Sequence, residues 1–201
     1  PFRASKNLSG VFLDYARWLE VLGLRTMDSL HQKIAEGKGL EVILISEAFH
    51  ALNLGKIAEE IASRPNVKVV AISGPSGSGK TTLSERLKIQ LQVCGKNPMT
   101  LAMDNYFVDR ENTPRDEEGN YDFEVIEALE LDMLSGHLGR LLAGEEVVIP
   151  QFDFIEGKKF PGKRITLKPG DILIMEGIHG LNDRITDVIP KEERYGIFVS
   201  P

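Results

Sequence analysis

One short stretch of this chain has residue types and spacing suited to binding phosphate. Residues 74–82 read GPSGSGKTT and match the pattern G-x-x-x-x-G-K-[ST] at every fixed position. Glycines allow successive backbone N–H groups to turn inward around an anion, and the lysine adds a mobile positive charge. Contacts to a nucleoside triphosphate are expected from Gly74, Ser76, Gly77, Ser78, Gly79, Lys80, Thr81 and Thr82.

The sequence on either side of this loop distinguishes a phosphate site from a flexible Gly/Ser linker. Residues 67–73 (VKVVAIS) form an apolar, β-branched run typical of a buried strand. The following LSERLK places Leu83 and Leu87 on one face, as in an amphipathic helix. Such a helix directs the positive end of its dipole at bound phosphates, whereas a linker predicts neither a strand nor a helix.

Two carboxylates come directly after other predicted strands. Asp104 follows MTLAM (99–103), and Glu176 follows DILIM (171–175). Ligands of open parallel sheets bind at the carboxyl ends of the strands, so both carboxylates should lie near Lys80. Phosphoryl transfer to a hydroxyl needs a proton acceptor and a metal ion, which we predict to be Asp104 and a Mg²⁺ held by Glu176 and the Thr81 hydroxyl. The alternative for either carboxylate is a helix cap or a solvated side chain.

The expected elements place this chain in the α/β class. Strands and helices alternate from Val67 onward, which indicates a parallel sheet of the P-loop NTPase type flanked by helices. Residues 147–154 and 160–170 predict a projecting β-hairpin with its turn at 155–159. Helical periodicity over residues 1–65 predicts an N-terminal helical appendage, so the expected domains are 1–65 and a kinase core at 66–201.

Composition and charge argue against several classes of partner. The net charge of −6 provides no general attraction to nucleic acid or to an anionic membrane. No apolar run is long enough to span a bilayer, and no signal peptide is visible. The single cysteine, Cys94, excludes an internal disulfide framework and fits a reducing compartment. We therefore expect a cytoplasmic protein with a small-molecule acceptor. The sequence leaves open whether the protein forms a homo-oligomer.

Five motifs, taken in order, resemble the uridine kinase and phosphoribulokinase family of P-loop kinases. They are GPSGSGKTT, MDNYF, YDFEVIEAL, IPQFDF and ILIMEGIHGL, and the resemblance extends over residues 68–200. It implies an ATP- and Mg²⁺-dependent kinase acting on a small acceptor, most simply a nucleoside, with Asp104 as the base for its 5′-hydroxyl. The acceptor contacts that it implies are Phe107, Glu124, Phe152, Phe154 and Ile178.

The chain departs from the family pattern where the acceptor would be selected. The YDF motif normally continues Asp-His-Pro, but Glu124-Val125-Ile126 follows it here. Uridine kinases normally have Tyr at the position of Phe152 and His at that of Gly157, and neither residue here can supply the corresponding hydrogen bond. We therefore expect weak discrimination among acceptors, or preference for a different one.

The resemblance also bears on the two ends of the chain. An arginine-rich lid helix follows the last strand in the family, and we expect it to be absent from this chain. Residues 1–65 resemble part of the editing-associated domain of threonyl-tRNA synthetases, but its metal-binding histidine pair is not visible, so we assign this region no activity.

Two other functions stay open. A nucleotide-binding regulatory module would bind ATP without phosphorylating any acceptor. A GTPase or motor is less favoured, because the chain has no guanine-reading N-K-x-D motif and the sequence Asp104-Asn105-Tyr106 suits a hydroxyl acceptor better than water.

Overall fold

The computed structural model describes residues 6–200, and the chain divides into two compact units, residues 1–53 and 54–201. The division falls within helix α3 (Gly39–Ser63), whose last turns bury Leu54, Ala58 and Ile61 in the core of the second unit. The predicted domain boundary at residue 65 stays a prediction.

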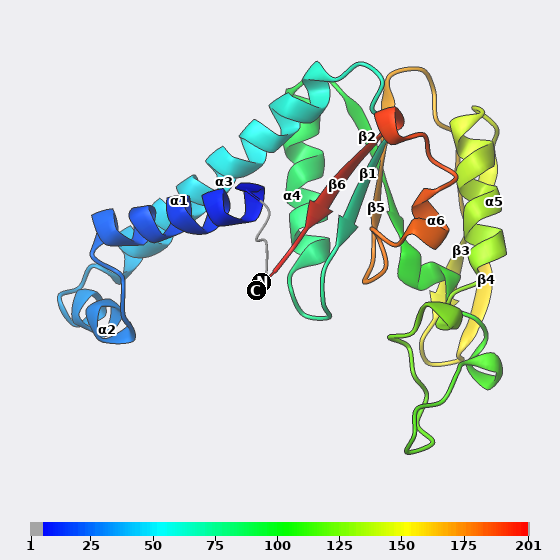
Figure 1. Cartoon of the computed structure of the whole chain (residues 1–201), viewed down its shortest axis with the longest axis horizontal. Coiled ribbons are helices and arrows are strands. Elements are labelled where there is room, and N and C mark those ends of the chain that lie inside the picture. The colour runs from blue at the N-terminus through cyan, green and yellow to red at the C-terminus, as the bar shows by residue number, and fades with distance from the viewer. Residues whose placement is uncertain (1–5, 201) are drawn as a thin grey trace. The chain divides into compact units, whose positions relative to one another are not determined.

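The first unit is helical. It comprises α1 (Lys6–Leu22), α2 (Met27–Ala35) and the first part of α3 (Figure 1). Thr26 caps α2 because its hydroxyl accepts the Ser29 N–H, while the Ser29 hydroxyl accepts the Thr26 N–H. The Trp18 ring stacks on Phe49 with a centroid distance of 4.4 Å.

The second unit contains a four-stranded parallel sheet, which confirms the predicted α/β class. The strand order is β2 (Asn97–Ala102), β5 (Asp171–Glu176), β1 (Val69–Ser73) and β6 (Arg194–Phe198). Alternate residues of the central strands enter two separate hydrophobic clusters, because successive side chains of a strand point to opposite faces. Helix α4 (Lys80–Val93) covers one face, and α5 (Leu131–Leu142) with α6 (Asp183–Thr186) covers the other (Figure 1).

The predicted hairpin is present as a separate two-stranded antiparallel sheet. It consists of β3 (Val147–Asp153) and β4 (Lys158–Ile165). Its turn is shorter than expected, because Lys158 and Lys159 already belong to β4 and pair with Asp153 and Phe152. The prediction that Lys158 and Lys159 lie in the turn is therefore wrong.

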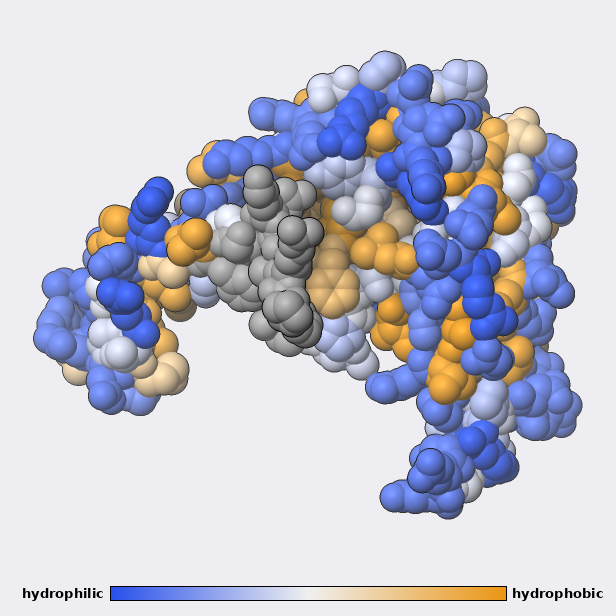
Figure 2. Space-filling view, in the orientation of Figure 1, coloured by the Kyte–Doolittle hydropathy of each residue, from blue (hydrophilic) through white to orange (hydrophobic). Residues whose placement is uncertain are grey.

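The segment between β2 and α5 follows an irregular path. It contains three short 3-10 helices, η1 (Met103–Tyr106), η2 (Arg110–Asn112) and η3 (Ile126–Ala128). A further 3-10 helix, η4 (Lys191–Glu193), lies outside this segment and precedes β6. The Tyr106 carbonyl accepts the Glu130 N–H, and the Ala128 carbonyl accepts the Val108 N–H, so the two ends of the segment are joined. Residues 110–120 extend away from the sheet with a hydrophilic surface (Figures 1 and 2).

Over residues 6–200, no helix combines the length and apolar character needed to cross a bilayer.

Candidate functional site

Residues 74–82, called the phosphate loop below, join β1 to α4 and contain glycine for two different reasons. Gly77 and Gly79 have φ angles of 74° and 88°, a left-handed conformation that costs other residues about 1–2 kcal/mol. At Gly74 the constraint is space, since a Cβ there would lie 2.3 Å from the Val199 carbonyl oxygen. The loop is thus wedged against the segment that follows β6.

Two side chains of the phosphate loop have donors available for an anion. The Ser78 hydroxyl is buried and has no hydrogen-bond partner among the described residues. Lys80 Nζ donates to the Pro75 carbonyl at 2.9 Å, which uses one of its three protons. The N-terminus of α4 begins at Lys80 and adds its dipole. These features fit the phosphates of a nucleotide.

Thr81 and Glu176 form an oxygen pair beside the loop. The Thr81 hydroxyl donates to Glu176 Oε1 at 3.1 Å. Burial raises the pKa of Glu176, an effect that the Thr81 hydrogen bond opposes and the nearby Asp104 charge reinforces. A hydroxyl and a carboxylate are suitable Mg²⁺ ligands, but no group of three or more acidic, His or Cys side chains that could hold a metal is found among residues 6–200. A Mg²⁺ ion here would therefore need phosphate or water oxygens to complete its ligands.

Asp104 lies near this pair because of the sheet register. Ala102 and Glu176 are directly paired at the ends of β2 and β5, and Asp104 follows two residues later in η1. The Asp104 side chain reaches the surface, yet surrounding protein atoms desolvate it and raise its pKa, while the Lys80 charge lowers it. The structure therefore brings together the three charged groups that the sequence suggested, from three distant parts of the chain.

An aromatic cluster begins three residues after Asp104. The Phe107 ring packs edge-to-face against Phe123, Phe152 and Phe154, at centroid distances of 5.1, 5.8 and 6.3 Å. Phe107 and Phe152 are buried, whereas Phe154 is 57% exposed. The structure thus places three of the expected acceptor residues in one cluster. It adds Phe123, which the sequence analysis did not select although its position in the YDF motif could have indicated it.

The two remaining expected acceptor residues occupy separate positions. Glu124 is exposed and follows Phe123, and its backbone N–H donates to Asp122 Oδ1 at 2.8 Å. Ile178 is half-buried, and its carbonyl accepts the Ser73 hydroxyl at 2.7 Å. This bond ties the segment after Glu176 to the end of β1, just before the phosphate loop.

Arg110 occupies the space beside Gly157, a feature that the sequence did not suggest. A Cβ on Gly157 would lie 2.7 Å from Arg110 Cβ and 2.9 Å from its Nε. The guanidinium donates to the carbonyls of Phe154 and Ile155, so it fastens the hairpin turn. A histidine at position 157 could not enter this arrangement unless Arg110 moved.

His137 of α5 contacts a residue of η1. Its Nδ1 lies 3.0 Å from the Tyr106 hydroxyl, and the side chain is partly buried. Burial lowers the pKa of His137, and the Arg140 charge lowers it further. The residue therefore joins α5 to η1, the turn that carries Asp104.

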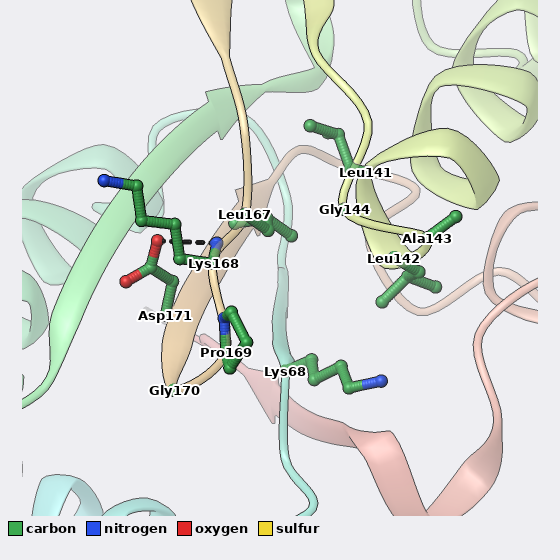
Figure 3. Close-up of a pocket in the computed structure, with 10 residues that line it drawn as sticks. All are labelled: Lys68, Leu141, Leu142, Ala143, Gly144, Leu167, Lys168, Pro169, Gly170 and Asp171. Atoms are coloured by element: carbon green, nitrogen blue, oxygen red, sulfur yellow. Dashed lines mark hydrogen bonds between the residues drawn. The ribbon is translucent and has the colours of Figure 1, made fainter.

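A pocket of about 340 Å³ lies where the strands of the sheet begin, at the opposite end from the phosphate loop (Figure 3). It is lined by Lys68 and Asp171, which stand at the amino-terminal ends of β1 and β5, and by the end of α5. Lys68 is paired with Glu193 at 2.7 Å, and Asp171 accepts hydrogen bonds from Asn97 and the Lys168 N–H. Because the four strands of the main sheet run in parallel, this pocket lies at the opposite ends of the strands from the phosphate loop.

Comparison with known proteins adds information about ancestry. The model of the phosphoribulokinase / uridine kinase family matches residues 69–199. A uridine kinase of Halobacterium salinarum is 31% identical over 114 residues, which cover 57% of this chain and 49% of the relative. A uridine kinase of Staphylococcus aureus is 34% identical over 119 residues, covering 58% and 55%. The chain thus spans about half the length of these relatives.

A solved structure supports the fold. A possible uridine kinase from Bacillus stearothermophilus superimposes with a TM-score of 0.61 at 22% identity, over 78% of this chain and 83% of that one. At this level of identity the likeness concerns the fold alone.

Proposed function

Because this chain belongs to the phosphoribulokinase / uridine kinase family, we propose that it transfers the γ-phosphoryl group of ATP to a hydroxyl of a small acceptor, most simply a nucleoside. The observation that carries the proposal is the convergence of Lys80, Asp104 and Glu176 at the sheet edge next to the phosphate loop. Phosphoryl transfer depends mainly on positioning and charge neutralisation, which this arrangement supplies.

The nucleotide phosphates would be bound by the phosphate loop. Its backbone N–H groups, the Ser78 hydroxyl and Lys80 Nζ are the donors, and the start of α4 adds a positive dipole. Thr81 and Glu176 are the residues that would hold Mg²⁺, whose charge would offset that of the phosphates when it is bound.

Asp104 is proposed to accept the proton of the attacking hydroxyl. A raised pKa makes a carboxylate a stronger base, provided that it stays ionised at the working pH. Lys80 opposes the shift and so favours the ionised form. The same lysine would thereby serve the phosphates and keep the base charged.

The acceptor is proposed to lie against the aromatic cluster around Phe107. Ring faces and edges suit a planar base, but Phe152 has no polar atom on its side chain and Gly157 has no side chain. We therefore expect several nucleosides to be accepted with similar kcat/KM, because few hydrogen bonds would distinguish them.

The proposal is tested by a Mg·ATP phosphoryl-transfer assay with a nucleoside panel and ribulose 5-phosphate. Transfer that is lost in Lys80→Ala and retained in Lys88→Ala, a second lysine of α4, would support it. ATP binding without transfer to any acceptor would overturn it in favour of a nucleotide-binding regulatory module.

A further inference from the structure

Lys159 of β4 is a largely buried cation that the proposed chemistry does not use. Its side chain is 13% exposed. Its Nζ donates to the Phe107 carbonyl at 2.8 Å and lies 2.5 Å from Glu130 Oε1 and 3.5 Å from Asp109 Oδ1. One ammonium group thus connects the hairpin to the segment after η1 and to the start of α5.

A second hydrogen bond joins the same hairpin to the same turn. The Phe152 N–H donates to Asn105 Oδ1 at 3.1 Å, and Phe152 is the cross-strand partner of Lys159. The chain on either side of Tyr106 is therefore fixed to one rung of the hairpin, through Asn105 and through Phe107. Asp104 is the residue directly before this doubly held stretch.

A lysine side chain is well suited to connecting the hairpin to the segment after η1. An ammonium group has three donors, and here a carbonyl and two carboxylates surround it. Removing a buried partner leaves the opposite charges unpaired, which costs far more than loss of a surface ion pair. A lysine on the outward side of a hairpin strand, such as the exposed Lys158, has no comparable surroundings.

We propose that Lys159 is a positioning residue, which sets the distance between the Asp104 carboxylate and an acceptor bound at Phe107. The inference rests on the proposed kinase function and deepens it. Misplacement of reacting groups by about 1 Å can lower a rate by about 100-fold. Since Lys159 contacts no residue of the phosphate loop in the interactions described, its loss should impair acceptor use and leave ATP affinity intact.

The test compares four variants of the full chain with wild type. Lys159→Met removes the ammonium group, and Lys158→Met on the neighbouring position is the matched control. Lys159→Arg restores the positive charge. The double variant Lys159→Met/Glu130→Gln also neutralises Glu130, the carboxylate that Lys159→Met would leave without its ammonium partner. Comparing the double variant with Lys159→Met separates an effect on stability from an effect on positioning.

We expect Lys159→Met to raise the acceptor KM by about 10-fold and to lower kcat by about 10- to 100-fold, with an unchanged Kd for ATP. The double variant should regain stability but keep the kinetic defect, Lys159→Arg should recover part of the activity, and Lys158→Met should match wild type. Wild-type acceptor kinetics in Lys159→Met, or full kinetic recovery in the double variant, would overturn the inference.

Amide hydrogen exchange distinguishes failure of the positioning role of Lys159 from failure of the proposed kinase function. If wild type phosphorylates no acceptor, the proposed function fails, but the positioning role still predicts faster amide exchange over residues 104–109 in Lys159→Met than in Lys158→Met. Equal exchange in the two variants would refute the positioning role independently of activity.

Discussion

Replacing Gly74 with alanine tests why the phosphate loop starts with glycine. The added Cβ would lie 2.3 Å from the Val199 carbonyl oxygen and 2.8 Å from Ser78 Oγ, and contacts under 3.0 Å essentially never occur. Either the loop or the chain after β6 must move by at least about 0.7 Å to reach that limit. Overpacking of this kind costs about 1–3 kcal/mol.

The displacement should also weaken the hydrogen bond from Val199 N–H to the Ser73 carbonyl, which is 2.7 Å long. Its net contribution of about 1 kcal/mol brings the expected loss in unfolding free energy to about 2–4 kcal/mol. Because the new methyl group would also lie only 2.8 Å from Ser78 Oγ, a proposed phosphate donor, nucleotide affinity should fall as well.

Urea unfolding followed by far-UV circular dichroism measures the stability change. Tryptophan fluorescence is unsuitable, because the only tryptophan, Trp18, lies in the first unit. Gly136→Ala in α5 is the control: its Cβ meets no atom within 4 Å, so it should stabilise by about 0.5–1 kcal/mol. Equal stability of Gly74→Ala and wild type would refute the steric argument.

Three further predictions concern the site and its supports. The acid limb of kcat should lie above pH 3.8, because desolvation raises the pKa of Asp104 and the protonated base is inactive; a limb at or below 3.8 in a pH–rate profile would contradict this. Burial lowers the pKa of His137, so the unfolded chain binds the proton more readily than the folded chain, and the unfolding free energy should fall as the pH drops below 6.5. Urea unfolding at pH 7.5 and 5.5 should show a smaller loss of unfolding free energy in His137→Phe than in wild type, because phenylalanine does not titrate. Gly157→Ala should destabilise wild type by about 1–2 kcal/mol more than it destabilises Arg110→Gly, because the glycine at 110 removes both the Cβ at 2.7 Å and the Nε at 2.9 Å from the added methyl group. Additivity in this double-mutant cycle would show that the two residues do not compete for space.

The sequence predicted the parallel sheet and the grouping of charges at its edge because both follow from local patterns. β1 is an unbroken apolar run, and a carboxylate at or just after the end of a parallel strand reaches the same edge as the loop after a neighbouring strand. Asp104 and Glu176 could therefore be placed together without knowledge of any contact.

The supports of the site could not be predicted in the same way. Lys159 resembles any surface lysine in the stretch IEGKK, and its role depends on a register that places it opposite Phe152. Arg110 fills space beside Gly157 only because the chain after η1 folds back on the hairpin. Such contacts between distant segments have no sequence periodicity, so tertiary packing alone determines them.

The central claim is that Asp104 acts as the base for the acceptor hydroxyl. The most direct test is kcat and ATP affinity of Asp104→Asn beside Asp187→Asn, an exposed aspartate following α6. We predict that Asp104→Asn lowers kcat at least about 100-fold while the Kd for Mg·ATP changes little, and that Asp187→Asn behaves as wild type. Retention of near-wild-type transfer by Asp104→Asn would contradict the account.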